Sequence, residues 1–333
     1  MKLKLSLCMI VKDEEESLPI CLESARNVVD EIIIVDTGST DSTKAVGNRF
    51  KAKLIDYRWR DNFAEARNVS LDNASGDWIL VLDSDEELVG ETQERIRGVI
   101  ESSVADGIEM IVRSEMPEND VVGFDEIKLL RLFRNRKEFR YSLPIHEQVR
   151  PAIEKFGGRI SDSSLVILHH GYARKMVQGK MDRGERNLRI LREALLKSPD
   201  DLYLNYQLGV ALMSTGNRVE AYMGLKRVLN MDYRRLPGAI LDKLFMKLSQ
   251  LSVEMNDNDS AIQFAEKSLR YNRANTISKY VLAVGYLSSN RIADGYKILL
   301  EIQTDHDANI RLGKQLENLI KACREALGFT ERS

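Results

Sequence analysis

About the first 115 residues alternate between short apolar runs and amphipathic stretches, and this order restricts the fold more than any other feature. Because the apolar runs are continuous, they are typical of strands covered on both faces. Strands are predicted at residues 5–11, 31–35, 53–57 and 78–82. Helices are predicted between them, at residues 15–27, 42–50 and 63–74. A β-α alternation of this kind predicts an α/β domain with a mostly parallel sheet and right-handed crossovers.

Three predicted strands end in polar clusters. The clusters are Lys12, Asp13 and Glu14 after the first strand, Asp36, Thr37 and Gly38 after the second, and Asp83, Ser84 and Asp85 after the fourth. In parallel sheets ligands bind at the carboxyl ends of the strands, so three clusters on one edge predict a binding site. Asp36 taken alone could equally be a loop carboxylate that caps a turn.

The Asp83-Ser84-Asp85 triplet suits a metal ion. Two carboxylates one residue apart on a turn can converge on Mg²⁺ or Mn²⁺. Such an ion commonly shares its other positions with phosphate oxygens and stabilises a departing phosphate. Glu86 and Glu87, which follow directly, are expected to begin the next helix, since a helix N-terminus favours negative charge.

The composition limits the classes of partner and compartment. The 49 basic and 51 acidic residues leave a net charge of −2, which gives no global reason to expect nucleic acid or an anionic membrane. Cys8, Cys21 and Cys323 are far apart and show no C-x-x-C spacing, so buried thiols in a reducing compartment are expected. No signal peptide or membrane span is predicted. We therefore expect a cytoplasmic protein.

Residues 116–172 are less regular. "EIKLLRLFRNRKEFRYSLPIHEQV" predicts two strands joined by a polar turn. Five of its basic residues are expected on a solvated face; they are Arg131, Arg134, Arg136, Lys137 and Arg140. Three of the four histidines then fall within 25 residues, and grouped histidine and glutamate suggest acid-base or metal chemistry.

From residue 173 onward the pattern is helical. Residues 203–229 place Gly209 and Ala221 where tetratricopeptide repeats need small side chains between two helices. Residues 282–296 repeat residues 208–222 at an offset of 74, and residues 255–269 supply another second helix. We predict two or three repeats and a capping helix at 310–327. They could bind an extended peptide, support self-association or only stabilise the chain.

Four motifs taken together resemble the family 2 glycosyltransferases of GT-A fold, over residues 1–172. They are residues 7–14, "EIIIVDTGSTDST", "ARN" at residues 66–68, and "WILVLDSDE". The resemblance implies that Ile10, Val11, Lys12 and Asp36 hold the base and ribose of a nucleotide-sugar. It also implies that Asp83 and Ser84 complete that site and that Arg67 approaches the diphosphate. Otherwise Arg67 would form a helix-surface ion pair with Glu65 or Asp61.

The "IHE" and "HxGY" motifs also look like those of bacterial glycosyltransferases that modify proteins, including bacteriocin S-glycosyltransferases and flagellin glycosyltransferases. By that resemblance Glu147 is the candidate general base, with His146 beside it. His169 is the candidate third metal ligand, after Asp83 and Asp85, and His170 ranks lower. The resemblance further implies that the repeats form a homodimer and position a polypeptide acceptor. Glu147 could instead only orient a turn.

The sequence thus predicts a metal-dependent, inverting glycosyltransferase at residues 1–172, followed by a repeat domain at 173–333. The expected donor is a UDP-sugar, the cofactor Mn²⁺ or Mg²⁺, and the acceptor a protein or peptide. Inversion requires one group to take the acceptor proton while cations support the leaving diphosphate. Three alternatives stay open: a cell-surface glycan or lipid-linked acceptor, a nucleotidyltransferase, and a non-catalytic repeat scaffold.

Overall fold

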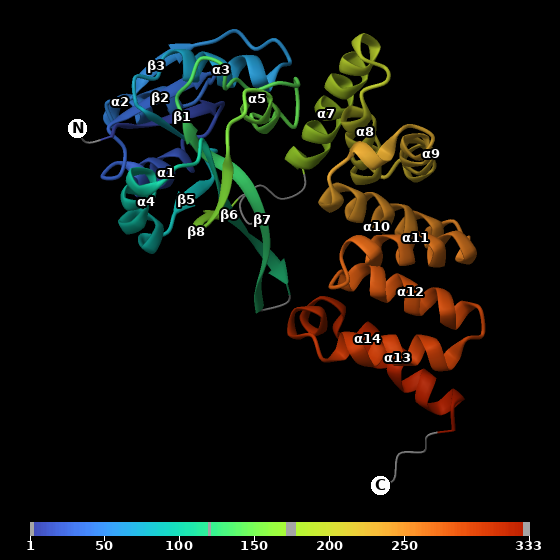
Figure 1. Cartoon of the computed structure of the whole chain (residues 1–333). Helices are drawn as coiled ribbons and strands as arrows, with labels where there is room; N and C mark the ends of the chain where they lie inside the picture. Colours follow the sequence, from blue (N-terminus) through green and yellow to red (C-terminus); the bar gives the residue numbers. More distant parts are fainter. Residues whose placement is uncertain (1–2, 119–120, 171–177, 329–333) are drawn as a thin grey trace. The chain divides into compact units, whose positions relative to one another are not determined.

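A computed structural model describes residues 3–118, 121–170 and 178–328, and its contacts divide the chain into two compact units (Figure 1). The units are Met1–Lys180 and Met181–Ser333. The domain boundary predicted at residues 172 and 173 lies outside the described residues. No helix in the described ranges is long and apolar enough to cross a membrane.

The first unit begins with the predicted alternation of strands and helices. The elements are β1 (Leu5–Val11), α1 (Leu18–Ala25), β2 (Glu31–Asp36), α2 (Thr43–Arg49), β3 (Lys53–Asp56), α3 (Phe63–Asp72) and β4 (Trp78–Val81). Each predicted element is present, so the α/β prediction is confirmed. The first helix is shorter than predicted and has a proline in its first turn, a position that tolerates the missing N–H.

A mixed eight-stranded sheet organises this unit, in the order β3-β2-β1-β4-β7-β6-β8-β5. The remaining elements are β5 (Glu86–Leu88), α4 (Gly90–Ser102), β6 (Gly107–Glu118), β7 (Val121–Arg134), α5 (Arg150–Lys155) and β8 (Ile160–His169). The strands β3, β2, β1 and β4 are parallel to one another. Since β1 lies between β2 and β4, the three polar clusters emerge at one edge, as predicted.

Both faces of the parallel strands are covered. Leu7 and Met9 of β1 belong to one apolar cluster, which also contains residues of α1, α2 and α4. Cys8 between them belongs to a second cluster, which contains residues of α3 and α5. Burial on both sides explains why these strands have continuous apolar sequences.

Two expectations from the sequence are wrong in this unit. Glu86 and Glu87 do not begin a helix; they form β5, which pairs antiparallel with β8 so that Glu86 lies opposite His169. The helix α4 begins only at Gly90. The local preference of acids for a helix N-terminus is thus overridden by pairing with a strand about 80 residues away in the sequence.

Of the two strands predicted at residues 126–149, the first is present and the second is not. Residues 121–134 form one long strand, β7, which pairs with β6, and residues 135–149 contain no strand apart from an isolated bridge between Ser142 and Gln148. The expectation that Arg131 lies on a solvated basic face is wrong as well, because its side chain is buried.

The second unit is entirely helical in its described part. Its helices are α7 (Gln178–Lys197), α8 (Leu202–Ser214), α9 (Arg218–Leu229), η1 (Tyr233–Arg235), α10 (Gly238–Glu254), α11 (Asn258–Tyr271), α12 (Thr276–Ser288), α13 (Ile292–Gln303) and α14 (His306–Ala326). Successive helices pack as the pairs α8/α9, α10/α11 and α12/α13 (Figure 1). This arrangement confirms the predicted tetratricopeptide domain, and α14 lies where the capping helix is predicted.

Small residues sit where paired helices touch. A Cβ atom added to Gly209 of α8 would lie 2.5 Å from Cδ2 of Leu225 on α9, and Leu225 is fully buried. Gly224 of α9 has more room, because its nearest neighbour would be the Cα of Gly209 at 3.7 Å. The two glycines therefore face different packing constraints.

We expect opposite effects from alanine at these glycines. Gly209→Ala should destabilise the chain, because overpacking costs about 1–3 kcal/mol and exceeds the gain in helix propensity. Gly224→Ala should stabilise it by about 0.5–1 kcal/mol, because alanine is the better helix former. Thermal unfolding measures both. The double variant Gly209→Ala, Leu225→Ala should not be additive, and simple additivity would contradict the proposed contact.

Candidate active site

The loops after β1 and β2 are joined by hydrogen bonds. The backbone N–H of Asp13 donates to Ser39 Oγ at 2.9 Å, and the N–H of Thr40 donates to Asp13 Oδ1 at 2.7 Å. The N–H of Glu14 donates to Thr43 Oγ1 at 2.7 Å. Two of the predicted polar clusters thus form one bonded rim at the carboxyl edge of the sheet.

Asp36 is the buried acid of this rim. Its Oδ1 accepts hydrogen bonds from the N–H groups of Gly38 and Ser39, both at 2.9 Å, and its side chain is only 1% exposed. Its Oδ2 is buried and has no hydrogen-bond partner within the described residues. A buried acceptor without a donor costs free energy. A ligand that brings an N–H or O–H group to Oδ2 would recover that loss.

The other residues predicted to contact the nucleotide lie beside Asp36. Val11 pairs with Asp36 across β1 and β2, and its carbonyl oxygen accepts from both the N–H and Oγ1 of Thr37. Ile10 is half-buried and Lys12 is exposed. These positions suit walls of a nucleotide site; their contacts with a nucleotide stay predictions.

Arg67 of α3 is buried and turned into the site. Its Nε donates to Glu147 Oε1 at 2.9 Å, and its Nη2 donates to Asp83 Oδ1 at 3.1 Å. Burial would lower the pKa of Arg67, but the charges of Glu147 and Asp83 raise it above the ordinary value. The alternative surface ion pair of Arg67 with Glu65 or Asp61 is therefore wrong.

A second buried arginine, Arg131 of β7, lies on the other side of Asp83. Its Nη2 donates to Asp83 Oδ2 at 2.7 Å and to Glu86 Oε1 at 2.5 Å. The N–H of Asp83 in turn donates to Glu86 Oε2 at 2.8 Å. Arg131 and Glu86 were missed as site residues. The signal was present, because Arg131 interrupts the apolar run "LLRLF", where a charge must be buried and paired.

The result is a network of three carboxylates and two guanidinium groups. Desolvation would raise the pKa of Asp83, but Arg131 and Arg67 outweigh it and hold that pKa well below the ordinary range. Asp83 also keeps 40% of its side-chain surface exposed, so water weakens each of these pairs. Burial raises the pKa of Glu86, which is only 2% exposed, to about 7.

Asp85 points to a different partner. Its Oδ2 lies 3.4 Å from His169 Nε2, while His169 Nδ1 lies 3.1 Å from Ser114 Oγ. The contact with Asp85 raises the pKa of His169. Ser114 is thus a hydrogen-bond partner for the second nitrogen of His169 and can fix the orientation of the ring. Ser84, between the two aspartates, is buried.

The side chains of Asp85 and His169 fit a divalent cation as a pair. A carboxylate and an imidazole are both acceptable ligands for Mn²⁺. Within the described ranges no group of three or more His, Cys, Asp or Glu side chains is arranged to hold a metal. Asp83 fits less well, because each of its oxygens already accepts from an arginine.

The segment that carries His146 and Glu147 is fixed to α3. Asn68 bonds both the N–H and the carbonyl of Tyr141, and the N–H of Phe63 donates to the Pro144 carbonyl at 2.8 Å. The backbone of His146 has a positive φ of 53°, and its ring is exposed. Desolvation by neighbouring protein lowers the pKa of that ring even so.

Glu147 and His170 are both engaged. Glu147 is 14% exposed and accepts from Arg67, as described above. The side chain of His170 contacts Glu87, with Nε2 2.9 Å from Oε2, while its backbone N–H donates to the Asp85 carbonyl at 2.9 Å. The structure thus brings Glu147, Arg67, Asp83, Asp85 and His169 to one edge, while the His170 ring contacts Glu87.

Comparisons with known proteins identify similar chains. Residues 6–150 match the family described as Glycosyl transferase family 2. A TPR repeat-containing protein of Synechococcus elongatus is 37% identical over 273 residues, covering 80% of this chain and 66% of that protein. The SPbeta prophage-derived glycosyltransferase SunS of Bacillus subtilis is 24% identical over 231 residues, covering 68% of this chain and 53% of SunS.

A solved structure is similar at lower identity. The crystal structure of S. aureus TarS 1-349 in complex with UDP-GlcNAc has a TM-score of 0.43 and 15% sequence identity, covering 80% of this chain and 91% of that one. The chain spans about two thirds or less of the length of the two curated relatives.

Removing the positive charge of Arg131 should be strongly destabilising. Arg131→Met leaves Asp83 and Glu86 without their shared cation, and breaking a buried pair costs about 3–5 kcal/mol. The exposed Arg136→Met is the control and should cost less than about 1 kcal/mol. Urea unfolding measures both. Adding Glu86→Gln to Arg131→Met should recover part of the lost stability. An equal loss of stability in Arg131→Met and in this double variant would contradict the pairing of Arg131 with Glu86.

Proposed function

We propose that the protein is a metal-dependent, inverting glycosyltransferase of GT-A fold, because residues 6–150 match the family described as Glycosyl transferase family 2. The observation that carries the proposal is the position of the buried Arg67, which joins Asp83 to Glu147 at the carboxyl edge of the sheet. A cation beside the leaving group and a carboxylate on the acceptor side are what inversion requires.

The proposed donor is a UDP-sugar. Uracil carries an N–H group between two carbonyls, and the unpartnered Oδ2 of Asp36 is a buried acceptor for such a donor. Ile10, Val11 and the exposed Lys12 would line the base and ribose. Ser84 and the backbone around it would lie next to the ribose or diphosphate.

Asp85 and His169 would hold Mn²⁺ or Mg²⁺. When bound, the cation supplies positive charge that offsets the charge developing on the diphosphate. Ser114 would keep the His169 ring turned toward Asp85. Asp83 is predicted from the sequence to be a direct metal ligand, but we assign it a different role. It accepts hydrogen bonds from both arginines and would orient Arg67 toward the diphosphate.

Glu147 is the proposed general base. Both of its contacts with Arg67 use Oε1, which leaves Oε2 to take the proton of an acceptor hydroxyl or thiol. Arg67 therefore connects the leaving-group side to the base. His146 would stay beside the base at the exposed rim.

We propose a protein or peptide acceptor, because tetratricopeptide helices present extended surfaces suited to polypeptides. The same helices could form a homodimer. The three cysteines are free and buried, which is consistent with action in the cytoplasm.

The metal assignment can be tested on binding alone. Asp85→Asn should lower the Mn²⁺-dependent affinity for UDP by more than about tenfold, because it removes a charged ligand. Asp162→Asn, an exposed acid paired with Lys128, is the control and should bind as wild type does. Calorimetry with and without Mn²⁺ measures the effect. Unchanged Mn²⁺-dependent binding by the Asp85 variant would exclude this site.

The base assignment separates binding from transfer. Glu147→Gln keeps an acceptor for Arg67 but cannot take a proton, so transfer should fall about 10²–10⁴-fold. UDP affinity should change by less than about twofold, since a base acts on the acceptor. The measurement is incorporation of labelled sugar into proteins of an extract, with a panel of UDP-sugars. Glu154→Gln on α5 is the control.

A comparable fall in UDP affinity and transfer for Glu147→Gln would instead assign Glu147 the role of anchoring Arg67. That result would leave the family assignment intact and overturn only the proposed base.

A further inference from the structure

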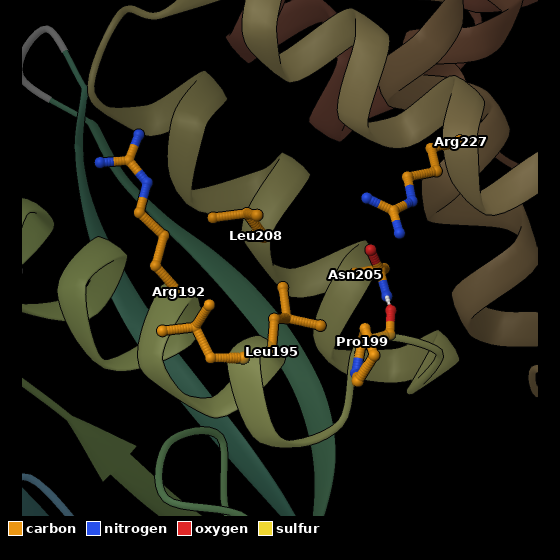
Figure 2. A pocket seen from close by; sticks show the side chains of 7 residues that line it. Arg192, Leu195, Pro199, Asn205, Leu208 and Arg227 are labelled. Carbon is orange, nitrogen blue, oxygen red and sulfur yellow. Dashed lines mark hydrogen bonds between the residues drawn. The ribbon is translucent and has the colours of Figure 1, made fainter.

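A pocket of about 300 Å³ opens within the second unit, between α7, α8 and α9 (Figure 2). Arg192 of α7 and Arg227 of α9 lie at opposite ends, with Leu195 and Leu208 between them. Both leucines are half-buried, and both arginines are exposed. The pocket therefore combines an apolar floor with cationic ends.

Asn205 adds an oriented polar group to the pocket. It is only 5% exposed, and its amide nitrogen donates to the carbonyls of Pro199 at 2.9 Å and Asp201 at 2.8 Å. Both amide hydrogens are therefore used, which leaves Oδ1 as the acceptor for a ligand. Figure 2 shows Oδ1 on the side of the pocket where Arg227 lies.

The apolar surface continues beyond the pocket along α9. Val219 and Met223 are each 64% exposed, and with Arg227 they follow one another at a spacing of four residues. Residues at that spacing share one face of a helix. On α7, Leu196 is 85% exposed and lies four residues after Arg192. An occupant that covers these side chains must be longer than the pocket itself.

The charges at the pocket favour an acidic occupant. Arg192 approaches Glu220 at 3.5 Å, but both side chains are more than half exposed, so that pair is weak. Arg227 lies in the last turn of α9, where the helix dipole favours a positive charge. An occupant with two carboxylates can approach both guanidinium groups, one at each end, and its apolar groups can cover the leucines.

We propose that this groove docks an acidic segment of the polypeptide acceptor that carries leucine-like side chains. One apolar side chain lies over Leu195 and Leu208, one carboxylate lies at Arg192 and another at Arg227, and a backbone N–H donates to Asn205 Oδ1. Further apolar side chains cover Met223 and Val219. The inference rests on the proposed transfer to a polypeptide and assigns the feature by which that polypeptide is recognised.

The test uses the full chain and a fluorescein-labelled synthetic peptide of alternating glutamate and leucine. Fluorescence anisotropy should show saturable binding, and a matched peptide with glutamine for glutamate should bind at least about tenfold more weakly. Arg227→Glu should weaken binding of the acidic peptide about tenfold, and Arg227→Gln by less. Arg273→Glu, the same charge change at an exposed residue of α11's following loop, is the control.

Met223→Ser tests the apolar part and should weaken both peptides alike. Equal affinity of the acidic and glutamine peptides, or equal binding by the Arg227 and Arg273 variants, would overturn the proposal. So would tighter binding of dodecanoate than of the peptide, which would indicate a site for an acyl anion. Loss of self-association in Arg227→Glu with unchanged peptide binding would indicate a contact between copies of this chain.

The failure of this proposal can be told apart from failure of the proposed function. Hydrolysis of UDP-sugars without an acceptor depends on the first unit, and Arg227→Glu should leave it unchanged. Donor hydrolysis without peptide binding would overturn only the proposed docking groove. Peptide binding without any donor hydrolysis would overturn only the proposed glycosyltransferase activity.

Discussion

The arrangement of the first unit depends on the Asp83 carboxylate, which two buried arginines share. Arg67 comes from α3 and Arg131 from β7, so one side chain at the end of β4 connects both neighbouring elements. Glu147 and Glu86 complete the network at its two ends. Buried guanidinium groups are costly without such partners, and so the five side chains specify one another's positions.

Because Asp83 binds both arginines, the two aspartates of the Asp-Ser-Asp triplet have different partners. Asp83 is turned toward the arginines, whereas Asp85 is turned toward His169. The difference follows from β5, which begins directly after Asp85 and pairs with β8, so that His169 arrives beside Asp85. A single residue between two aspartates therefore separates an arginine-orienting group from a candidate metal ligand. Spacing alone predicts two equivalent ligands.

The sequence predicts the parallel half of the sheet well, because continuous apolar runs and turn residues are local signals. It also places Asp36, Asp83 and Asp85 on one edge, and the family resemblance adds Arg67 to them. It does not predict β5, since the pairing of Glu86 with His169 joins residues far apart in the chain. For the same reason Arg131 was assigned to a solvated face: its acidic partners are 45 and 48 residues earlier.

In the repeat domain, too, the sequence predicts the helices but not the surface that their packing leaves exposed. Gly209 and Ala221 reveal a helix pair because close packing demands small residues, and the offset of 74 locates a second copy of the pattern. The groove depends instead on α7, which carries no repeat signature, and on which face of α9 its neighbours leave uncovered. Val219, Met223 and Arg227 have helical spacing in the sequence, yet that spacing is equally compatible with a buried stripe. Their exposure, together with the arginine of a neighbouring helix, is what supports the proposed docking of an acidic polypeptide on this stripe.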